Sequence, residues 1–326
     1  MNLAFTIATA NYLPYAKTLS DSVLKHNPEY QFKIILLDKV ENRFDITYFA
    51  PAEIIEVEAL GILELDEMVK RYTVFELSNA LKPFVTDYFL SKNSINFITY
   101  LDSDILVLNN FSCIHNLLAS NSIVISAHAF SSLPDDGLTC NDKSFLMHGT
   151  YNGGFFAVRN DLSANKFIKW WKHKLKDECL VNYYQGLYVD QKWLNFVPVF
   201  FNGVNITTHL GINVGYWNLH ERRIEKFRNN FLVNETDDLI FFHFSGFDLR
   251  NPSIISIHQN RYTYTNRPDI KGICESYAEQ VKKNSFSQFS SMACYYYQNN
   301  SPNKKNNSVS HKIKRFIKNK INLLRK

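Results

Sequence analysis

The apolar run FITYLDSDILVL at residues 97–108 limits the possible fold more than any other feature of the chain. It is typical of a central strand in a parallel sheet, and it ends in two carboxylates, Asp102 and Asp104, separated only by Ser103. Open α/β sheets bind ligands at the carboxyl ends of their strands. Two close carboxylates stay charged together only beside a positive group, and Mg²⁺ or Mn²⁺ carrying a diphosphate suits such oxygen ligands. The alternative is a surface turn whose aspartates only cap the next segment.

The start of the chain predicts an α/β fold. Residues 3–8 and 32–37 read as buried strands, with a turn at 9–12 and a helix at about 13–26 between them. This order is typical of nucleotide-binding α/β folds. The first turn contains neither GxGxxG nor GxxxxGK, which disfavours dinucleotide dehydrogenases and phosphate-loop proteins.

Further elements are expected along the rest of the chain. A helical stretch at about 62–90 should kink or restart at Pro83. Strands, turns and caps are then predicted in this order: a strand at 122–127, a polar loop at 131–143, a strand at 150–158, a helix capped by Asp161, a short helical turn at 188–195, and strands near 204–206 and 239–244.

The end of the chain divides into three parts. An amphipathic helix is predicted over about 271–297, with an apolar side formed by Cys274, Tyr277, Val281 and Phe289. We therefore expect these domains: a catalytic domain at 1–270, a helical extension at 271–298, a linker at 299–310 and a basic amphipathic tail at 311–326.

The net charge of +5 is unevenly distributed over the 326 residues. Residues 301–326 hold nine Lys/Arg and no acidic residue, so residues 1–300 carry a charge of −4. A broad nucleic-acid surface on the folded body is therefore not expected. The five cysteines form no CxxC pair, and neither a signal peptide nor an apolar stretch of membrane-spanning length is visible. These features favour a reducing, cytoplasmic location.

The tail at 311–326, HKIKRFIKNKINLLRK, places apolar residues on one helical side among seven Lys/Arg. This pattern is typical of an interfacial helix on anionic lipid, and it predicts a protein bound peripherally to the cytoplasmic face of the inner membrane. The alternatives are a disordered basic terminus and, less favoured because no aromatic platform accompanies the charge, nucleic-acid binding.

Several strings, taken in order, resemble a known family. They are ATANYLPYAKTLSDSVLKHNPE, YLDSDILVL, YNGGFFAVRN, YVDQKWLN and FFHFSGFD. The chain resembles the metal-dependent glycosyltransferases of the A-type fold over roughly residues 3–250, most closely family 8, which contains glycogenin and bacterial lipopolysaccharide galactosyltransferases. ELSNALKPF and INVGYWNLHER are similar to a branch of bacterial surface-polysaccharide enzymes. The resemblance implies a Rossmann-like mixed central sheet flanked by helices, with a C-terminal helical extension.

The resemblance assigns the first turn to the nucleoside of a UDP-sugar. Residues Ala8, Thr9, Ala10, Asn11 and Tyr12 match the segment that holds the uracil and ribose. Small residues would let the backbone approach the base, and the tyrosine ring offers a stacking face. The alternative is a strand-to-helix turn in which the asparagine is only a cap.

The resemblance also implies a metal site. Asp102 and Asp104 match the metal-binding pair, with Ser103 beside the donor, and His243 matches a third ligand. An imidazole ligand favours Mn²⁺ over Mg²⁺. Gly246, which has no Cβ, would let the backbone approach a phosphate. The alternative for His243 is a structural role, because an isolated histidine after an apolar strand is more often structural than a metal ligand.

Other donor contacts come from three further segments. Lys82 matches a basic position facing the diphosphate, with a solvated helix lysine as the alternative. Asn152, Gly153 and Gly154 match a loop beside the donor sugar, with a β-bulge or kink as the alternative.

Catalytic roles are implied for Asp190 and Gln191, which match the family's Asp-Gln pair. The aspartate would bind sugar hydroxyls and the glutamine would lie near the anomeric carbon; the alternative is a helix cap. The sequence departs from the family where a phosphate-binding lysine is usual. Leu249 stands there, followed by Arg250, which is the candidate replacement.

Together these features predict a retaining hexosyltransferase. It would use a UDP-sugar and Mn²⁺ or Mg²⁺ to glycosylate a hydroxyl of a glycan or glycolipid acceptor in lipopolysaccharide or capsule synthesis. One rival is a catalytically inactive relative that binds glycans or nucleotide sugars. The other is a sugar-nucleotide pyrophosphorylase, which should have a Gly-rich, basic first loop that this chain lacks.

Overall fold

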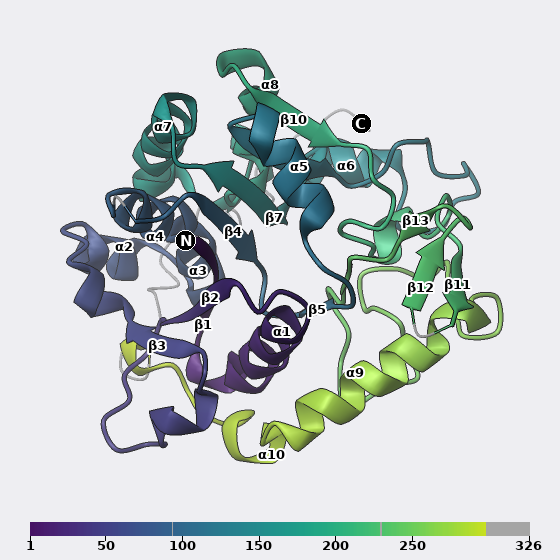
Figure 1. Cartoon of the computed structure of the whole chain (residues 1–326), viewed down its shortest axis with the longest axis horizontal. Coiled ribbons are helices and arrows are strands. Elements are labelled where there is room, and N and C mark those ends of the chain that lie inside the picture. The colour runs from purple at the N-terminus through teal and green to yellow at the C-terminus, as the bar shows by residue number, and fades with distance from the viewer. Residues whose placement is uncertain (93, 229, 298–326) are drawn as a thin grey trace, which may run out of the picture.

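The computed structural model describes residues 1–92, 94–228 and 230–297, and its centre is a seven-stranded mixed sheet (Figure 1). The strand order is β10-β6-β7-β4-β1-β2-β3. The bounds are β1 Asn2–Ala8, β2 Tyr30–Leu36, β3 Glu53–Glu56, β4 Phe97–Leu101, β6 Ile123–Ala127, β7 Tyr151–Arg159 and β10 Val204–Thr207. Strand β7 runs antiparallel to its neighbours β4 and β6, and the other pairs are parallel.

The segment that carries the two aspartates differs from its prediction in two ways. Strand β4 is parallel to β1 on one side but antiparallel to β7 on the other, so it does not lie in a purely parallel sheet. The run at 97–108 is also two strands, because the chain turns after Leu101 and the Ile105 amide donates to the Asp102 carbonyl at 3.2 Å. Strand β5, Ile105–Val107, then pairs with β14, Phe241–His243. The aspartates therefore occupy a tight turn between two strands.

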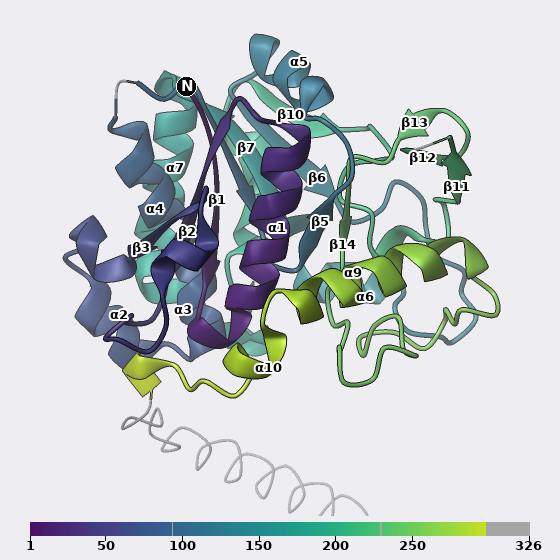
Figure 2. The same ribbon diagram turned by 60° about the horizontal axis from the view of Figure 1, so that its bottom comes forward.

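Helices cover both faces of the sheet (Figure 2). They are α1 Leu13–His26, α2 Leu65–Arg71, α3 Val74–Ala80, α4 Lys82–Leu90, α5 Ser112–Ser120, α6 Asp142–His148, α7 Leu162–Glu178, α8 Val197–Phe200, α9 Lys271–Lys283 and α10 Phe286–Phe289. Besides β5 and β14, the short strands outside the central sheet are β8 Val181–Asn182, β9 Leu187–Tyr188, β11 Ile224–Phe227, β12 Asn230–Val233 and β13 Asp237–Asp238.

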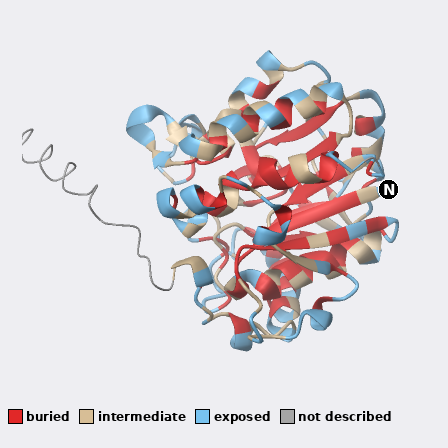
Figure 3. Ribbon diagram, turned by 90° about the vertical axis from the view of Figure 1, so that its left-hand side faces the viewer, coloured by how far each residue is buried: buried red, intermediate tan, exposed pale blue. Residues whose placement is uncertain are grey.

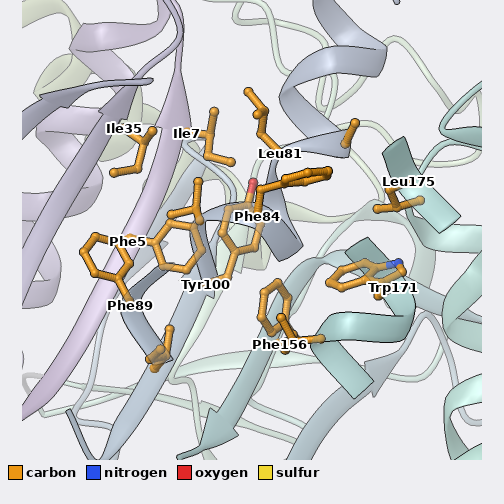
Figure 4. Packing of buried hydrophobic residues seen from close by; sticks show 14 of the residues in the cluster. Phe5, Ile7, Ile35, Leu81, Phe84, Phe89, Tyr100, Phe156, Trp171 and Leu175 are labelled. Atoms are coloured by element: carbon orange, nitrogen blue, oxygen red, sulfur yellow. The ribbon is translucent and has the colours of Figure 1, made fainter. Parts of the chain in front are cut away.

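The alternation of buried side chains along β1 explains why helices pack on both faces of the sheet. Phe5 and Ile7 point into one buried cluster together with residues of α4 and α7, such as Phe84 and Trp171 (Figure 4). Ala4 and Ala8 point to the other face, where α1 and α5 pack. Successive strand side chains point to opposite faces, so a strand that is apolar throughout needs helices on both sides. Figure 3 shows this burial continuing along the central strands.

Two predicted helices are interrupted. The stretch at 62–90 is three helices, and Pro83 lies in the first turn of α4, so it marks a new start. The helix predicted over 271–297 ends at Lys283, because Ser285 adopts the left-handed conformation with φ 64° before α10 begins.

The segment after residue 270 packs on the body. The Tyr277 ring of α9 stacks on Phe244, with centroids 3.8 Å apart, whereas Phe289 of α10 is buried in a different cluster. The division into residues 1–270 and 271–298 stays a prediction, and the linker at 299–310 and the tail at 311–326 lie outside the described residues. Among the helices of the described segments, none is both long and apolar enough to cross a membrane.

Candidate active site

A cleft of about 770 Å³ opens at the edge where β1 and β4 end. Ala8 closes β1 and Asp102 follows β4 at this edge. Because β7 runs antiparallel to β4, its first residues, including Asn152, arrive at the same edge. The strand directions thus bring together three segments that are far apart in the sequence.

Most of the predicted site residues line this cleft. They are Ala8, Thr9, Tyr12, Lys82, Asp102, Ser103, Asp104, Asn152, Gly153, Gly154, Asp190, Gln191 and His243. Asn11 and Gly246 lie outside the lining. The Asn11 carboxamide oxygen accepts a hydrogen bond from the Thr9 hydroxyl at 2.6 Å. Gly246 has φ +72°, and a Cβ there would lie 2.5 Å from His258 Cδ2, so its freedom serves loop packing.

Asp102, Asp104 and His243 form a cluster with the composition of a metal site. Their candidate ligand atoms all lie within 4.8 Å of one another. His243 Nε2 is 3.1 Å from Asp104 Oδ1 and 3.9 Å from Asp102 Oδ2. The pairing of β14 with β5 sets His243 opposite Ile105, directly beside the turn that holds the aspartates. Two carboxylates and one imidazole are ligands that a divalent transition metal accepts.

A chain of buried amides orients His243. Its Nδ1 lies 3.2 Å from Asn213 Oδ1, and since an amide oxygen only accepts, we assign the Nδ1 proton to this bond. Asn213 Nδ2 donates to Asn152 Oδ1 at 3.1 Å, and Asn152 Nδ2 lies 3.2 Å from His128 Nε2. His128 Nδ1 lies 3.1 Å from the Thr150 carbonyl. Nε2 of His243 is therefore the nitrogen left to face the aspartates, as a metal ligand requires.

The charges of the cluster affect its protonation. Burial acts to lower the pKa of His243, but the charge and hydrogen bond of Asp104, together with the charge of Asp102, raise it overall. Burial acts to raise the pKa of Asp104, and the charge and hydrogen bond of His243 lower it overall. The negative electrostatic potential of the two carboxylates therefore favours a cation between the side chains of Asp102, Asp104 and His243.

Lys82 joins this cluster to Asp190. Its Nζ lies 3.0 Å from Asp190 Oδ2, 3.4 Å from Asp102 Oδ1 and 2.9 Å from the Gly153 carbonyl that accepts its hydrogen bond. Lys82 is 1% exposed, so the alternative of a solvated helix lysine is wrong. Burial raises the pKa of Asp190 to about 6, against the lowering effect of Lys82 and with a further rise from Asp102.

The two glycines permit this convergence. A Cβ on Gly153 would lie 2.6 Å from Asp190 Oδ2. A Cβ on Gly154 would lie 2.4 Å from His243 Cε1 and 2.7 Å from Asp102 Oδ2. The pairing register between β6 and β7 also shifts between Ile125 and Ala127. The β-bulge or kink that is the alternative explanation for these glycines is therefore present as well. The strand can therefore pass the cluster only where side chains are absent.

Gln191 is held in place at both ends of its side chain. Its Oε1 accepts from the Gly153 amide at 2.9 Å, and its Nε2 donates to the His148 carbonyl at 3.1 Å. It opens a short 3-10 helix, Gln191–Phe196, so the turn predicted at 188–195 begins at the cleft. These bonds fix the amide group against the wall formed by β7.

Sequence reasoning gave no role to several residues of the cleft wall. These are aromatic and histidine side chains, namely Phe75, His128, Phe145, His148, Tyr188, Tyr216, Trp217 and His258. His128 directly follows β6, so the rule that singled out Asp102 at the end of a strand could also have found it. Leu249 is buried, and Arg250 lies outside the lining with its Nε 3.5 Å from Asp248 Oδ1, so its role as the replacement for a phosphate-binding lysine stays a prediction.

Comparisons with known proteins agree with this geometry at the level of the fold. No family model matches the chain. It is 26% identical to the uncharacterized protein YfnF of Bacillus subtilis over 203 residues, which is 62% of this chain and 65% of YfnF. It is 22% identical to the uncharacterized YfnD of the same organism over 254 residues, 75% of this chain and 77% of YfnD. The chain therefore spans about two thirds of YfnF.

Solved structures include the galactosyltransferase LgtC in complex with donor and acceptor sugar analogs. Its TM-score is 0.51 at 14% identity, and the match covers 87% of this chain and 96% of LgtC. An active-site variant of LgtC with glutamine replaced by glutamate has a TM-score of 0.52 at 14% identity, with the same coverage. The predicted A-type glycosyltransferase fold is confirmed.

Proposed function

We propose that this chain, which has the A-type glycosyltransferase fold, transfers a hexose from a UDP-sugar to a hydroxyl of a glycan or glycolipid acceptor. The proposed pathway class is bacterial surface polysaccharide synthesis, as lipopolysaccharide or capsule. The fold, the cleft at the strand ends and the Asp102–Asp104–His243 cluster support this proposal. We propose retention of the anomeric configuration.

The observation that carries the proposal is the charge of the cleft. Three carboxylates line it, those of Asp102, Asp104 and Asp190, and among the lining residues Lys82 supplies the single Lys/Arg charge. A diphosphate would enter this acidic cleft unfavourably without a further cation. Asp102, Asp104 and His243 would hold a divalent ion, Mn²⁺ rather than Mg²⁺ given the imidazole, and when bound it would neutralise charge on the departing UDP.

The first turn would bind the nucleoside. Ala8 and Thr9 line the cleft with small side chains, and Tyr12 lines it while remaining 46% exposed, so its ring is free to stack on a base. Lys82 would face the diphosphate from the opposite wall, where its ammonium already lies 3.4 Å from Asp102 Oδ1.

Asp190 and Gln191 would act at the sugar. Asp190 is 1% exposed and paired with Lys82, which suits an acceptor of sugar hydroxyl hydrogen bonds better than a nucleophile. Gln191 has its amide fixed against β7, and LgtC also has a glutamine in its active site. A front-face displacement, in which UDP leaves from the side that the acceptor attacks, therefore fits this wall better than a covalent glycosyl-enzyme.

A donor panel tests the proposal. The protein would be incubated with UDP-glucose, UDP-galactose and UDP-N-acetylglucosamine, each with Mn²⁺, Mg²⁺ or a chelator, and release of UDP would be measured. We expect slow hydrolysis of one donor with metal and none with chelator. UDP binding without release from any donor would favour an inactive nucleotide-sugar-binding relative.

We also propose that the basic tail at 311–326 attaches the protein peripherally to the cytoplasmic face of the inner membrane. Nine positive charges in residues 301–326 support this proposal. Deleting residues 301–326 should reduce co-sedimentation with anionic vesicles and leave hydrolysis of the donor unchanged. Equal co-sedimentation of the truncated and full-length proteins would contradict the role of the tail.

A further inference from the structure

An exposed aromatic surface lies on α7, α8 and the turn between Gln191 and Phe196. We call it the aromatic face and define it by five residues: Trp170, Trp193, Phe196, Val199 and Phe200. Phe196 is 45% exposed, Val199 78% and Phe200 55%. Apolar side chains exposed singly are ordinary, but a contiguous group marks a binding surface.

The rings of the aromatic face hold one another in place. Trp170 contacts Trp193 and Phe200 edge to face, with centroids 6.1 Å and 5.7 Å apart. Phe196 stacks on Phe200 at 5.1 Å. Leu194 and Val197, on the opposite side of the same turn, are fully buried in the core beneath. The surface is therefore preorganised, so covering it would need little ordering of side chains.

Lysines of α7 border one side of this apolar surface. Helix α7 carries five lysines against two acidic residues, although residues 1–300 as a whole are acidic. Lys166 and Lys174 stand four residues before and after Trp170, hence on the same side of the helix. Lys174 Nζ lies 5.1 Å from the Trp193 ring centroid and 3.8 Å from Glu178 Oε2, so Lys166, which is exposed, carries more of the free positive charge.

We infer that the aromatic face docks on an anionic lipid bilayer, independently of the C-terminal tail. Tryptophan and phenylalanine bordered by lysines are the composition of surfaces that lie in the headgroup region. Protein–protein interfaces share the enrichment in aromatic residues, but lysine is depleted from them. The charge around Trp170 therefore favours a lipid surface over a protein partner or a second copy of this chain.

This docking would place the cleft at the bilayer. The turn that begins at Gln191 in the cleft wall ends at Phe196 in the aromatic face. A lipid-linked acceptor could then reach the cleft without leaving the membrane. That consequence rests on the proposed function, whereas the docking itself does not.

Bromolipid quenching tests the docking in the full-length protein. The chain has four tryptophans, two of which, Trp170 and Trp193, belong to the aromatic face. Trp171 and Trp217 are 0% and 2% exposed, and residues 298–326 contain none. Quenching of tryptophan emission by vesicles of brominated phosphatidylcholine and phosphatidylglycerol therefore reports the aromatic face and not the tail. We expect clear quenching, weaker with vesicles that lack phosphatidylglycerol.

A double variant and a matched control make the test specific. Phe196→Ser with Phe200→Ser keeps all four tryptophans and should reduce quenching at least twofold. Leu63→Ser with Phe227→Ser removes two apolar side chains that are 94% and 53% exposed elsewhere, and quenching should be unchanged. Circular dichroism would establish that these variants fold. Lys166→Glu is a further variant, which removes a positive charge and no apolar group, and quenching should fall in it as well.

Three results would overturn the inference. The first is co-sedimentation of the full-length protein with no bromolipid quenching, which would assign binding to the tail alone. The second is equal quenching in the Phe196→Ser, Phe200→Ser variant and the control. The third is a dimer in vesicle-free solution that dissociates in this variant, which would assign the aromatic face to a second copy of the chain.

Discussion

Lys82 and Asp190 form a buried ion pair in the wall of the cleft, with Nζ and Oδ2 3.0 Å apart. Their side chains are only 2% and 1% exposed. The lysine opens α4 and the aspartate precedes the turn at Gln191, so the pair ties two walls of the cleft together. A buried charge that loses its partner is costly, which makes this pair a structural requirement of the site as well as part of its chemistry.

A double-mutant cycle should reveal strong coupling in this pair. We expect Lys82→Met to lower the free energy of unfolding by roughly 3–5 kcal/mol, because it leaves the buried Asp190 carboxylate without its partner. Asp190→Asn should cost less, because Lys82 keeps the Asp102 carboxylate 3.4 Å away. The double variant should lose less than the sum, with a coupling of about 1–3 kcal/mol measured by urea unfolding. The pair Lys172–Asp87, 2.7 Å apart and about one third exposed, is the control and should couple by at most about 1 kcal/mol. Equal coupling in the two cycles would contradict the account.

Gly154→Ala should damage the metal cluster. The added methyl would lie 2.4 Å from His243 Cε1, so the histidine or the strand must move. We expect a destabilisation of about 1–3 kcal/mol and loss of the rise in melting temperature caused by UDP with Mn²⁺. Gly272→Ala is the matched control, since a Cβ there meets nothing within 4 Å on helix α9. It should stabilise by about 0.5–1 kcal/mol and keep the UDP response; a similar loss in both variants would sink the explanation.

His128 should make stability depend on pH. Burial lowers its pKa to about 4 from the ordinary 6.5, so the folded protein keeps the ring neutral. Between pH 6.5 and 4 the unfolded chain binds a proton that the folded chain does not, and stability from this group is lost as pH falls. Full loss amounts to roughly 3 kcal/mol.

Asp190 acts in the opposite direction over part of this range. Burial raises its folded pKa to about 6, so the folded chain keeps a proton that the unfolded chain releases, and acidification is stabilising. Comparing the pH dependence of stability of the wild type with that of His128→Gln isolates the contribution of the histidine, because Asp190 is present in both proteins. From pH 7 to pH 4 the wild type should lose roughly 3 kcal/mol relative to the variant in urea unfolding. A constant difference across this range would show that His128 is not held neutral.

The nucleotide should be UDP. Ala8, Thr9 and Tyr12 of the first turn line the cleft, and this turn resembles the uracil-binding segment of the A-type glycosyltransferases. In a thermal-shift panel with Mn²⁺ we expect UDP to raise the melting temperature more than GDP or CMP. A larger rise with GDP would reject the assignment of this turn to uracil.

Several features could be predicted from the sequence because their signals are local. The Asp102/Asp104 turn follows an apolar run that had to be a buried strand, and helix α1 begins and ends where predicted, at Leu13 and His26. The place of Pro83 in the first turn of α4 follows from its missing amide proton. His243 was assigned by resemblance alone, since an isolated histidine carries no local signal.

Other features depend on contacts that no local pattern encodes. The direction of β7 cannot be read from its residues, yet it decides that Asn152 and Gly153 reach the cleft. The burial of Lys82 depends on Asp190, 108 residues away. Helix α9 ends before Ser285, where neither glycine nor proline marks a break, because the chain there turns toward a different cluster around Phe289.

The most direct test of the central claim is the melting temperature of Asp104→Ala with UDP and Mn²⁺. In the wild type UDP should stabilise with Mn²⁺ and not with a chelator, since Asp102, Asp104 and His243 would hold the ion that receives the diphosphate. In Asp104→Ala this stabilisation should disappear while the fold is retained, and it should persist in Asp135→Ala, which changes an exposed loop residue. A full UDP response in Asp104→Ala, or in wild type with excess chelator, would contradict the account.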